Sequence, residues 1–303
     1  MSLNFSEKLK NILGETKVYQ DESMKKHITF RVGGNADYFV TPGTIDEVKK
    51  VVNLCQTEMV PYYIIGNGSN LLVGDKGYRG VIIQLYKEMS EIQIEGNHVK
   101  AQAGALLSKI GNKAYEEGLT GFEFAAGIPG TVGGAVVMNA GAYGGEMKDI
   151  LEEVKVLTAQ GEVLTLKNEE LELGYRTSII SKKEYIVLEA VFQLENGDRE
   201  AIKARMDELR IQRTTKQPLE YPSAGSTFKR PTGYFAGKLI QDAGLRGFQV
   251  GGAQVSEKHC GFVINKEGAT AADIQKLMHE VSAIVKEKFG VELEPEVKKL
   301  GEF

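Results

Sequence analysis

The chain has few cysteines, few histidines and no tryptophan, and these absences remove several classes of site. Its two cysteines, Cys55 and Cys260, are too few for a disulfide framework and too far apart for a redox pair or a zinc knuckle. The four histidines are scattered and show no metal-ligand spacing. We therefore expect no metal site, and we interpret Cys55 and His259 as packing residues.

Long hydrophobic runs and an excess of positive charge are also absent. No stretch approaches the ~20 apolar residues that span a bilayer, and the N-terminal segment lacks the apolar core and cleavage site of a secretory signal. The formal net charge of −4 offers no positive field to nucleic acid. We expect a cytoplasmic protein that acts on a small molecule, without membrane insertion or an obligate protein partner.

Two nucleotide and metal motifs are missing as well. The loop G-x-x-x-x-G-K-[ST] does not occur, because leucine follows Gly237-Lys238. The zinc-protease pattern H-E-x-x-H does not occur either, because His279-Glu280 lacks its second histidine. These absences argue against a nucleoside triphosphatase and a zinc hydrolase.

Glycine is abundant, with 35 glycines against 7 prolines among 303 residues. The first two-thirds of the chain predict an α+β domain in which strands predominate. Its expected strands are 36–41, 61–65, 81–85 and 185–195, with hairpins at 91–103 and 153–166 and helices after Thr44 and over 106–117.

The sequence pattern changes from strands to a charged helix at Asn196-Gly197, and we place a domain boundary after residue 197. A charged helix over 199–216 follows and ends before Pro218, as a helix preceding proline should. We then expect a polar loop, a short helix, two strands within 248–265, a helix over 270–289 and a closing strand over 291–300. The domains are thus 1–197 and 198–303.

The loop Gly66-Asn-Gly-Ser-Asn-Leu71 begins like a dinucleotide-binding fingerprint but lacks its third glycine. Two glycines after a strand expose consecutive backbone N–H groups, which together form a site suited to a diphosphate. A plain tight turn is an equally good interpretation of this loop alone.

A second segment, Gly127–Gly145, is too rich in glycine for a hairpin turn. Within it, Thr131–Ala140 predicts a short helix without bulky side chains at its start, so a ring or phosphate could lie against backbone. Close packing of two helices is the alternative. Two such loops in one domain favour a large ligand with a diphosphate and a flat ring.

Several polar segments are candidates for substrate chemistry. Arg176, in a loop after Gly174, suits a carboxylate or enolate ligand, although a surface arginine is the simpler interpretation. The cations Arg210, Arg213 and Lys216 complement a helix dipole or bind a diphosphate.

Two further segments could contribute acid–base chemistry. Ser226 is either a turn residue or a hydroxyl that delivers a proton. Glu296, placed in the predicted closing strand, is either solvated or directed into a cleft.

Taken in order, these segments resemble the UDP-N-acetylenolpyruvoylglucosamine reductase (MurB) family in its compact form. The segments that carry the resemblance are Thr29–Gly34, Gly66–Leu72, Gly127–Gly141, Gly174–Ser178, Gln217-Pro218, Ala224–Phe228, Ala236–Ile240 and Leu293–Val297. The resemblance implies an FAD-binding fold of the vanillyl-alcohol-oxidase type with two α+β subdomains, split here near residue 85. An α/β substrate-binding domain follows.

The resemblance also implies a reaction. NADPH reduces the flavin, the enolpyruvyl methylene carbon of UDP-N-acetylglucosamine enolpyruvate then receives hydride, and protonation of the neighbouring carbon gives UDP-N-acetylmuramate. Neither glycine-rich loop contains histidine or cysteine, so we expect the FAD to be bound non-covalently.

The same resemblance assigns residues to roles. Ser226 matches the proton donor, while Arg176 and Glu296 match the pair that binds the substrate carboxylate and stabilises developing charge. We expect Glu296 to be protonated or paired with a cation such as Lys298. The substrate-binding residues are Tyr175, Arg213, Lys216, Gln217 and Arg230. The FAD-binding residues are Arg31, Gly66, Asn67, Gly68, Ser69, Asn70, Leu71, Gly127, Ile128, Pro129, Gly130, Val132, Gly133, Gly134, Asn139, Ala140 and Gly141.

Two other functions compete with this one. An FAD-dependent sugar-lactone or alcohol oxidase would share the fold, but it needs a base rather than a proton donor. A nucleotide-binding module without catalysis would need neither a base nor a proton donor. Such a protein would be colourless when purified.

Overall fold

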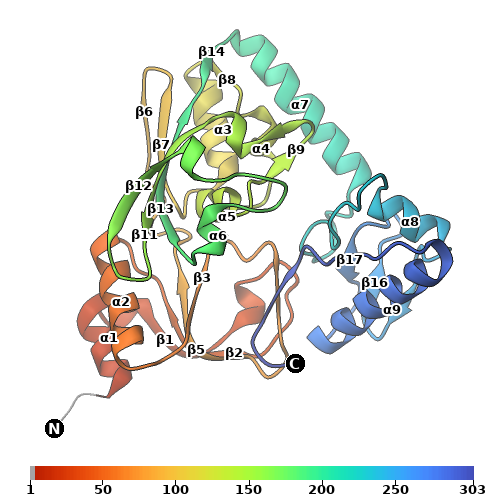
Figure 1. Ribbon diagram of the computed structural model, residues 1–303, viewed down its shortest axis with the longest axis horizontal. Coiled ribbons are helices and arrows are strands. Elements are labelled where there is room, and N and C mark those ends of the chain that lie inside the picture. The colour runs from red at the N-terminus through yellow and green to blue at the C-terminus, as the bar shows by residue number, and fades with distance from the viewer. Residues whose placement is uncertain (1–3) are drawn as a thin grey trace. The chain divides into compact units, whose positions relative to one another are not determined.

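A computed structural model describes residues 4–303 as a mixture of helices and strands (Figure 1). Residues 1–3, which fall within the predicted first domain and the segment inspected for a secretory signal, lie outside the described residues. The chain forms two compact units. The first holds the described residues up to Gln20 with Tyr38–Asn67 and Gly80–Gln212, and the second holds Asp21–Asp37, Gly68–Arg79 and Arg213–Phe303. The boundaries at 85 and 197 stay predictions.

Helices and strands alternate through the first two-thirds of the chain. The helices are α1 (Phe5–Leu13), α2 (Ile45–Thr57), α3 (Leu107–Glu116), α4 (Glu123–Ala126), α5 (Val132–Val137), α6 (Ile179–Lys182) and α7 (Arg199–Lys216). The longer strands are β1 (Val18–Ser23), β2 (Asn35–Val40), β3 (Tyr62–Ile65), β5 (Tyr78–Gln84), β6 (Ile92–Glu95), β7 (His98–Gln102), β11 (Leu151–Leu157), β12 (Val163–Lys167) and β13 (Ile186–Gln193). Short strands are β8 (Leu119–Thr120), β9 (Gly141–Ala142), β10 (Gly145–Glu146) and β14 (Glu195–Asn196).

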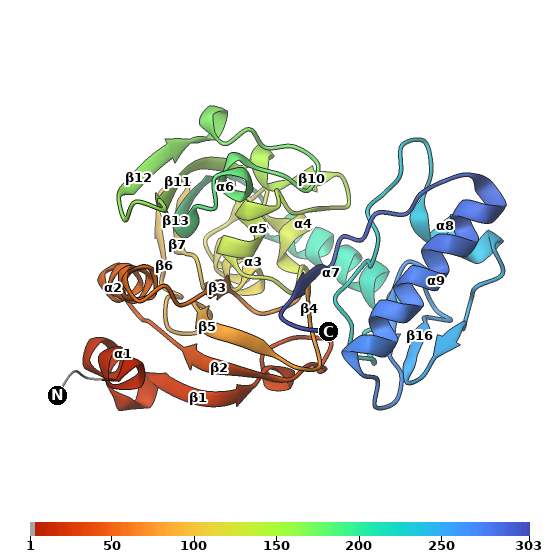
Figure 2. The ribbon, with the colours of Figure 1, turned by 60° about the horizontal axis from the view of Figure 1, so that its bottom comes forward.

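Two sheets organise these strands. One has the order β1-β2-β5-β3, and α1 and α2 lie side by side next to it (Figures 1 and 2). The other has the order β12-β11-β13-β7-β6 and contains both predicted hairpins, β6–β7 and β11–β12. The predicted strands and hairpins of this region are therefore confirmed.

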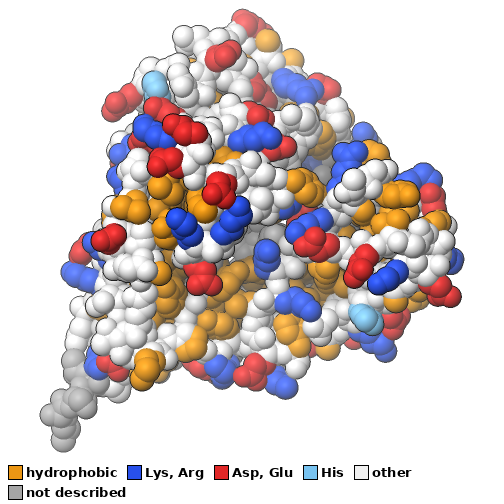
Figure 3. All heavy atoms as spheres, viewed as in Figure 1, with side chains coloured by type: hydrophobic (Ala, Val, Ile, Leu, Met, Phe, Trp, Pro, Cys, Tyr) orange, Lys and Arg blue, Asp and Glu red, His pale blue; other side chains and the backbone are white. Residues whose placement is uncertain are grey.

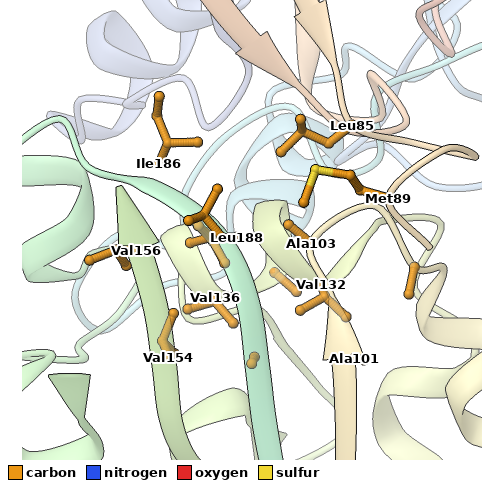
Figure 4. Packing of buried hydrophobic residues seen from close by; sticks show 14 of the residues in the cluster. Leu85, Met89, Ala101, Ala103, Val132, Val136, Val154, Val156, Ile186 and Leu188 are labelled. Atoms are coloured by element: carbon orange, nitrogen blue, oxygen red, sulfur yellow. The ribbon is translucent and has the colours of Figure 1, made fainter. Parts of the chain in front are cut away.

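Helix α5 forms because its apolar residues share one face. Val132, Ala135 and Val136 are buried at helical spacing, and they pack against β13 and β7. Figure 4 shows Val132 and Val136 among the valine, leucine and alanine side chains of these strands and of β11. Gly134 is exposed, whereas Gly133 lies close to Ala103, where an added Cβ atom would come within 3.2 Å of the alanine side chain.

The second unit is smaller, and its strands and helices carry buried apolar residues such as Val263, Ile274 and Leu277. It contains β4 (Leu71–Val73), α8 (Ala236–Asp242), β15 (Gln249–Val250), β16 (Ala253–Val255), β17 (Val263–Asn265), α9 (Ala271–Phe289) and β18 (Lys298–Leu300). Strands β15, β16 and β17 form an antiparallel sheet against which α9 packs, and β18 pairs in parallel with β4.

Two expectations about local structure need correction. The closing strand covers only Lys298–Leu300, because residues 291–297 make no ladder apart from a single bridge from Pro295 to Phe228. Glu296 therefore lies in an extended segment outside that strand.

The surface carries charged side chains of both signs. Positive and negative side chains are interspersed on the face drawn in Figure 3. Across residues 4–303, no helix is long and apolar enough to cross a membrane. The same residues contain no cluster of three or more metal-ligating side chains.

Cys55, predicted to be a packing residue, is fully buried on α2, and its burial raises the pKa of its thiol to about 12. In the unfolded chain the thiol has its ordinary pKa of 9.0. Its neutral form therefore contributes stability that is complete below pH 9 and is lost as pH rises toward 12. We expect the free energy of unfolding to fall more between about pH 8 and about pH 10.5 in the wild type than in Cys55→Ala. Equal declines in urea titrations would contradict this assignment.

Candidate functional site

The two glycine-rich loops meet in the first unit. A Cβ atom on Gly66 would lie 2.1 Å from Oγ1 of Thr131, so only glycine permits this approach. The Asn67 side chain donates to the Pro129 carbonyl at 3.0 Å, and Gln84 donates to the Gly66 carbonyl at 3.2 Å. The loops after β3 and before α5 therefore form one continuous backbone surface.

Helix α5 presents bare backbone at this surface. Its first turn is fixed by hydrogen bonds from the N–H groups of Val132 to Ala105 and of Gly133 to Ala103, at 2.9 and 2.8 Å. Gly134 is exposed, and a Cβ atom built on it would have no protein atom nearer than the Thr131 Oγ1 at 4.0 Å. A flat ring could lie here against main-chain atoms.

The remainder of the first loop belongs to the second unit. Gly68 has φ +62°, and a Cβ atom on it would lie 2.1 Å from the His27 carbonyl oxygen. The Thr29 N–H donates to the Gly68 carbonyl at 3.2 Å. The segment that carries Arg31, itself at φ +56° and exposed, therefore packs on this loop.

Ser226 and Glu296 lie on two extended segments that pair with each other in the second unit. Phe228 and Pro295 form an antiparallel bridge, and the Glu296 N–H donates to the Thr227 carbonyl at 2.8 Å. Ser226 is exposed, whereas Glu296 is 9% exposed. The unit thus brings a solvent-accessible hydroxyl next to a segment with a buried carboxyl group.

The first glycine-rich loop reaches the same place. The Asn70 side chain donates to the Glu296 carbonyl at 3.3 Å, and the Lys298 N–H donates to the Asn70 carbonyl at 3.0 Å. Within the second unit, the loop residues Gly68–Leu71 and the Ser226 and Glu296 segments therefore lie together.

Thr227 was missed by sequence reasoning because its role depends on contacts distant in sequence. It is fully buried, its hydroxyl accepts from the Val263 N–H at 2.9 Å, and its N–H donates to the Gly261 carbonyl at 2.9 Å. These bonds fix the backbone directly after Ser226.

Arg176 belongs to the first unit, in a tight turn closed by hydrogen bonds between Gly174 and Thr177. Its backbone φ is +56°, a value that residues other than glycine rarely adopt. Its guanidinium carbon lies 5.1 Å from the centre of the Tyr175 ring, which is half exposed.

The remaining predicted substrate-binding residues lie in the second unit. Arg213 donates to the Gln217 side chain at 3.0 Å, and Lys216 ends α7 beside it. The Arg230 guanidinium lies 3.9 Å from the centre of the Phe235 ring, which limits its motion.

His259 is confirmed as a packing residue. Its Nδ1 accepts from the Gly261 N–H at 3.1 Å, and its ring lies edge-on to Phe262. Burial lowers the pKa of His259, which favours the neutral ring.

The approach of Gly66 to Thr131 gives a testable expectation. We expect Gly66→Ala to lose most of its affinity for the FAD that the sequence predicts, because the new methyl group separates the two loops. The double variant Gly66→Ala with Thr131→Ala removes the clashing hydroxyl and should regain FAD binding. Fluorescence titration of apoprotein with FAD measures both, and equal loss in the single and double variants would contradict the loop contact.

Two family models match separate parts of this chain. The model of the UDP-N-acetylenolpyruvoylglucosamine reductase C-terminal domain matches residues 217–300, and the model of an FAD binding domain matches residues 36–167. The glucose dehydrogenase Phl p 4.0202 is similar over 64% of this chain and 44% of its own, with 15% identity and a TM-score of 0.52. The predicted FAD-binding fold of the vanillyl-alcohol-oxidase type is confirmed.

Similarity to the reductases extends over nearly the whole chain. The reductase of Geobacillus kaustophilus is 57% identical over 296 residues, which cover 98% of this chain and 97% of that protein. That of Alkaliphilus metalliredigens is 55% identical over 291 residues, or 96% of each chain. The crystal structure of the Thermus caldophilus reductase matches at 37% identity with a TM-score of 0.80, covering 94% of this chain and 98% of that one. The chain therefore belongs to the UDP-N-acetylenolpyruvoylglucosamine reductase family, whose members are oxidoreductases.

Proposed function

We propose that the protein uses FAD and NADPH to reduce UDP-N-acetylglucosamine enolpyruvate to UDP-N-acetylmuramate, a step of peptidoglycan precursor synthesis. The observation that carries the proposal is the pairing of the Ser226 and Glu296 segments beside loop Gly68–Leu71. A proton-donating hydroxyl and a carboxyl group next to a cofactor loop are what this reduction requires.

The residues present fit FAD. Gly66 and Gly134 leave main chain bare where any Cβ atom would either clash or project outward. Gly68, at φ +62°, turns the first loop so that its N–H groups are available to a diphosphate. Bound FAD supplies a two-electron carrier between NADPH and the enolpyruvyl double bond.

The three catalytic assignments follow from how charge moves in the substrate. Addition of hydride to the methylene carbon leaves negative charge on the carbon that bears the carboxylate. The Arg176 guanidinium can accommodate this charge because it is always protonated and donates in a planar fork. The added hydride has made the methylene carbon a methyl group, and Ser226 then donates its proton to the neighbouring carbon, which completes the C–H bond there.

Glu296 provides the carboxyl group of this site, either protonated or paired with a cation such as Lys298. The group is buried; a protonated carboxyl group there could donate a hydrogen bond to the developing enediolate, and an ionised one would need a cation beside it. Arg213, Lys216, Gln217 and Arg230 provide cations and an amide for the diphosphate and sugar.

We propose that the reaction takes place in the cytoplasm, where nucleotide sugars and NADPH occur. The partner of the protein is then its UDP-sugar substrate alone, without nucleic acid or an obligate protein.

Anaerobic NADPH consumption tests the proposal. We expect consumption only when UDP-N-acetylglucosamine enolpyruvate is present, with one product molecule formed per NADPH. Consumption that requires oxygen and ignores the substrate indicates an oxidase, and a colourless protein that releases no flavin on heating indicates a binding module. Either result overturns the proposal.

A further inference from the structure

The turn that carries Arg176 has a backbone conformation that needs support. Tyr175 and Arg176 are the two central residues between Gly174 and Thr177, and Arg176 takes the positive φ that such turns usually give to glycine. A conformation of this kind persists only where surrounding contacts determine it. The contacts that do so identify residues that act through Arg176.

Asn139 supports the first end of the turn. It is 1% exposed, and its Nδ2 donates to the Gly174 carbonyl at 3.1 Å. The backbone of Asn139 is itself left-handed, with φ +43°. The amide therefore lies buried directly beneath the turn.

Ser178 supports the other end. Its hydroxyl donates to the Val137 carbonyl at 2.6 Å and accepts from the N–H of Ser181 at the start of α6. Both anchors of the turn thus attach it to one segment, Val137–Asn139, which begins at the last residue of the glycine-bearing helix α5.

Glu146 and Lys148 fix the orientation of the Asn139 amide. Asn139 Nδ2 donates to the Glu146 carboxylate at 2.7 Å, and its Oδ1 accepts from the Lys148 N–H at 2.9 Å. Since an ionised carboxylate only accepts, the NH₂ group must face Glu146 and, with its second hydrogen, Gly174. Both donors of the amide are then used inside the protein.

We infer that Asn139, oriented by Glu146, is a positioning residue for Arg176 rather than a side-chain donor to the cofactor. This inference rests on the proposed function, because it assigns Asn139 to the step in which Arg176 stabilises charge on the substrate. Loss of the amide frees the Gly174 end of the turn, and the guanidinium then moves away from its working position.

The test separates positioning from general stability. Asn139→Ala keeps the main chain that the resemblance assigns to the FAD site, so we expect flavin reduction by NADPH to change little. Flavin reoxidation by substrate should slow about 10- to 100-fold, the cost of misplacing a reacting group by ~1 Å. The double variant with Arg176→Ala should be no slower than Arg176→Ala alone, because Asn139 has no other route to the reaction. Multiplying rate losses in the double variant would overturn the inference.

A matched control and a second variant complete the design. The Asn168 amide likewise donates twice, in its case to the backbone carbonyls of Lys148 and Leu151 in the first unit, and these acceptors lie outside the turn. Asn168→Ala should lose comparable stability and keep the wild-type reoxidation rate. If Asn139→Ala does not fold, Glu146→Ala should show the same selective loss, severalfold smaller.

The outcomes distinguish this inference from the proposed function. Wild-type protein that is not reoxidised by substrate refutes the proposed function. Wild-type reoxidation with normal rates in both Asn139→Ala and Glu146→Ala refutes the inference alone.

Discussion

Ser226→Ala is expected to separate the two halves of the reaction. NADPH should bleach the flavin absorbance at the wild-type rate, because the serine takes no part in that step. Reoxidation by substrate should slow roughly a thousandfold or more, since the variant lacks the general acid for the carbanionic carbon. Anaerobic stopped-flow absorbance measures the two rates in one preparation.

A nearby serine provides the control for this experiment. Ser223 lies in the same loop and pairs through its backbone with Ile264. Ser223→Ala should leave both rates unchanged. If Ser226→Ala slows both half-reactions equally, its effect is on folding or FAD binding, and its assignment as proton donor is wrong.

Gly134→Leu should have the second large effect, on FAD binding rather than on folding. Gly134 is an exposed position of α5 with open space around its Cβ direction. Leucine is a better helix former than glycine by about 0.8 kcal/mol, so the apoprotein should be as stable as the wild type or slightly more stable. The added side chain covers the backbone surface assigned to the ring, and we expect FAD affinity to fall at least a hundredfold.

Calorimetry of apoprotein and titration with FAD check these two parts separately. Ala201→Leu adds a similar side chain to an exposed position of α7 and should leave FAD affinity unchanged. A Gly134→Leu protein that binds FAD normally would show that the ring does not lie on α5.

Elements with local boundary residues could be predicted from the sequence. Helix α7 has the predicted bounds 199–216, because the Asp198 side chain accepts from the Ala201 N–H at its start and Pro218 follows its end. The hairpin β6–β7 was found because glycine and asparagine at its turn interrupt an alternating pattern.

Elements whose bounds depend on residues distant in sequence could not be predicted in the same way. Strand β18 is short because it pairs only with β4, far earlier in the chain. Helix α1 was missed although the sequence carries its start signal, a capping box of Asn4 and Glu7.

The residues of the candidate site could be predicted from the sequence, but the contacts that hold them in place could not. Glycine density marked both loops, and the family resemblance assigned Ser226, Arg176 and Glu296. The contacts of Thr131 with Gly66, of Thr227 with Val263 and of Asn139 with Gly174 join residues whose spacing carries no pattern. Such contacts follow from packing, which a single sequence does not encode locally.

Anaerobic reoxidation of the NADPH-reduced wild-type protein shows directly whether this chain reduces the enolpyruvyl double bond. We expect UDP-N-acetylglucosamine enolpyruvate to restore the flavin absorbance, with one UDP-N-acetylmuramate formed for each flavin reoxidised. Absorbance that stays bleached with this substrate and returns only on admission of oxygen would contradict this expectation.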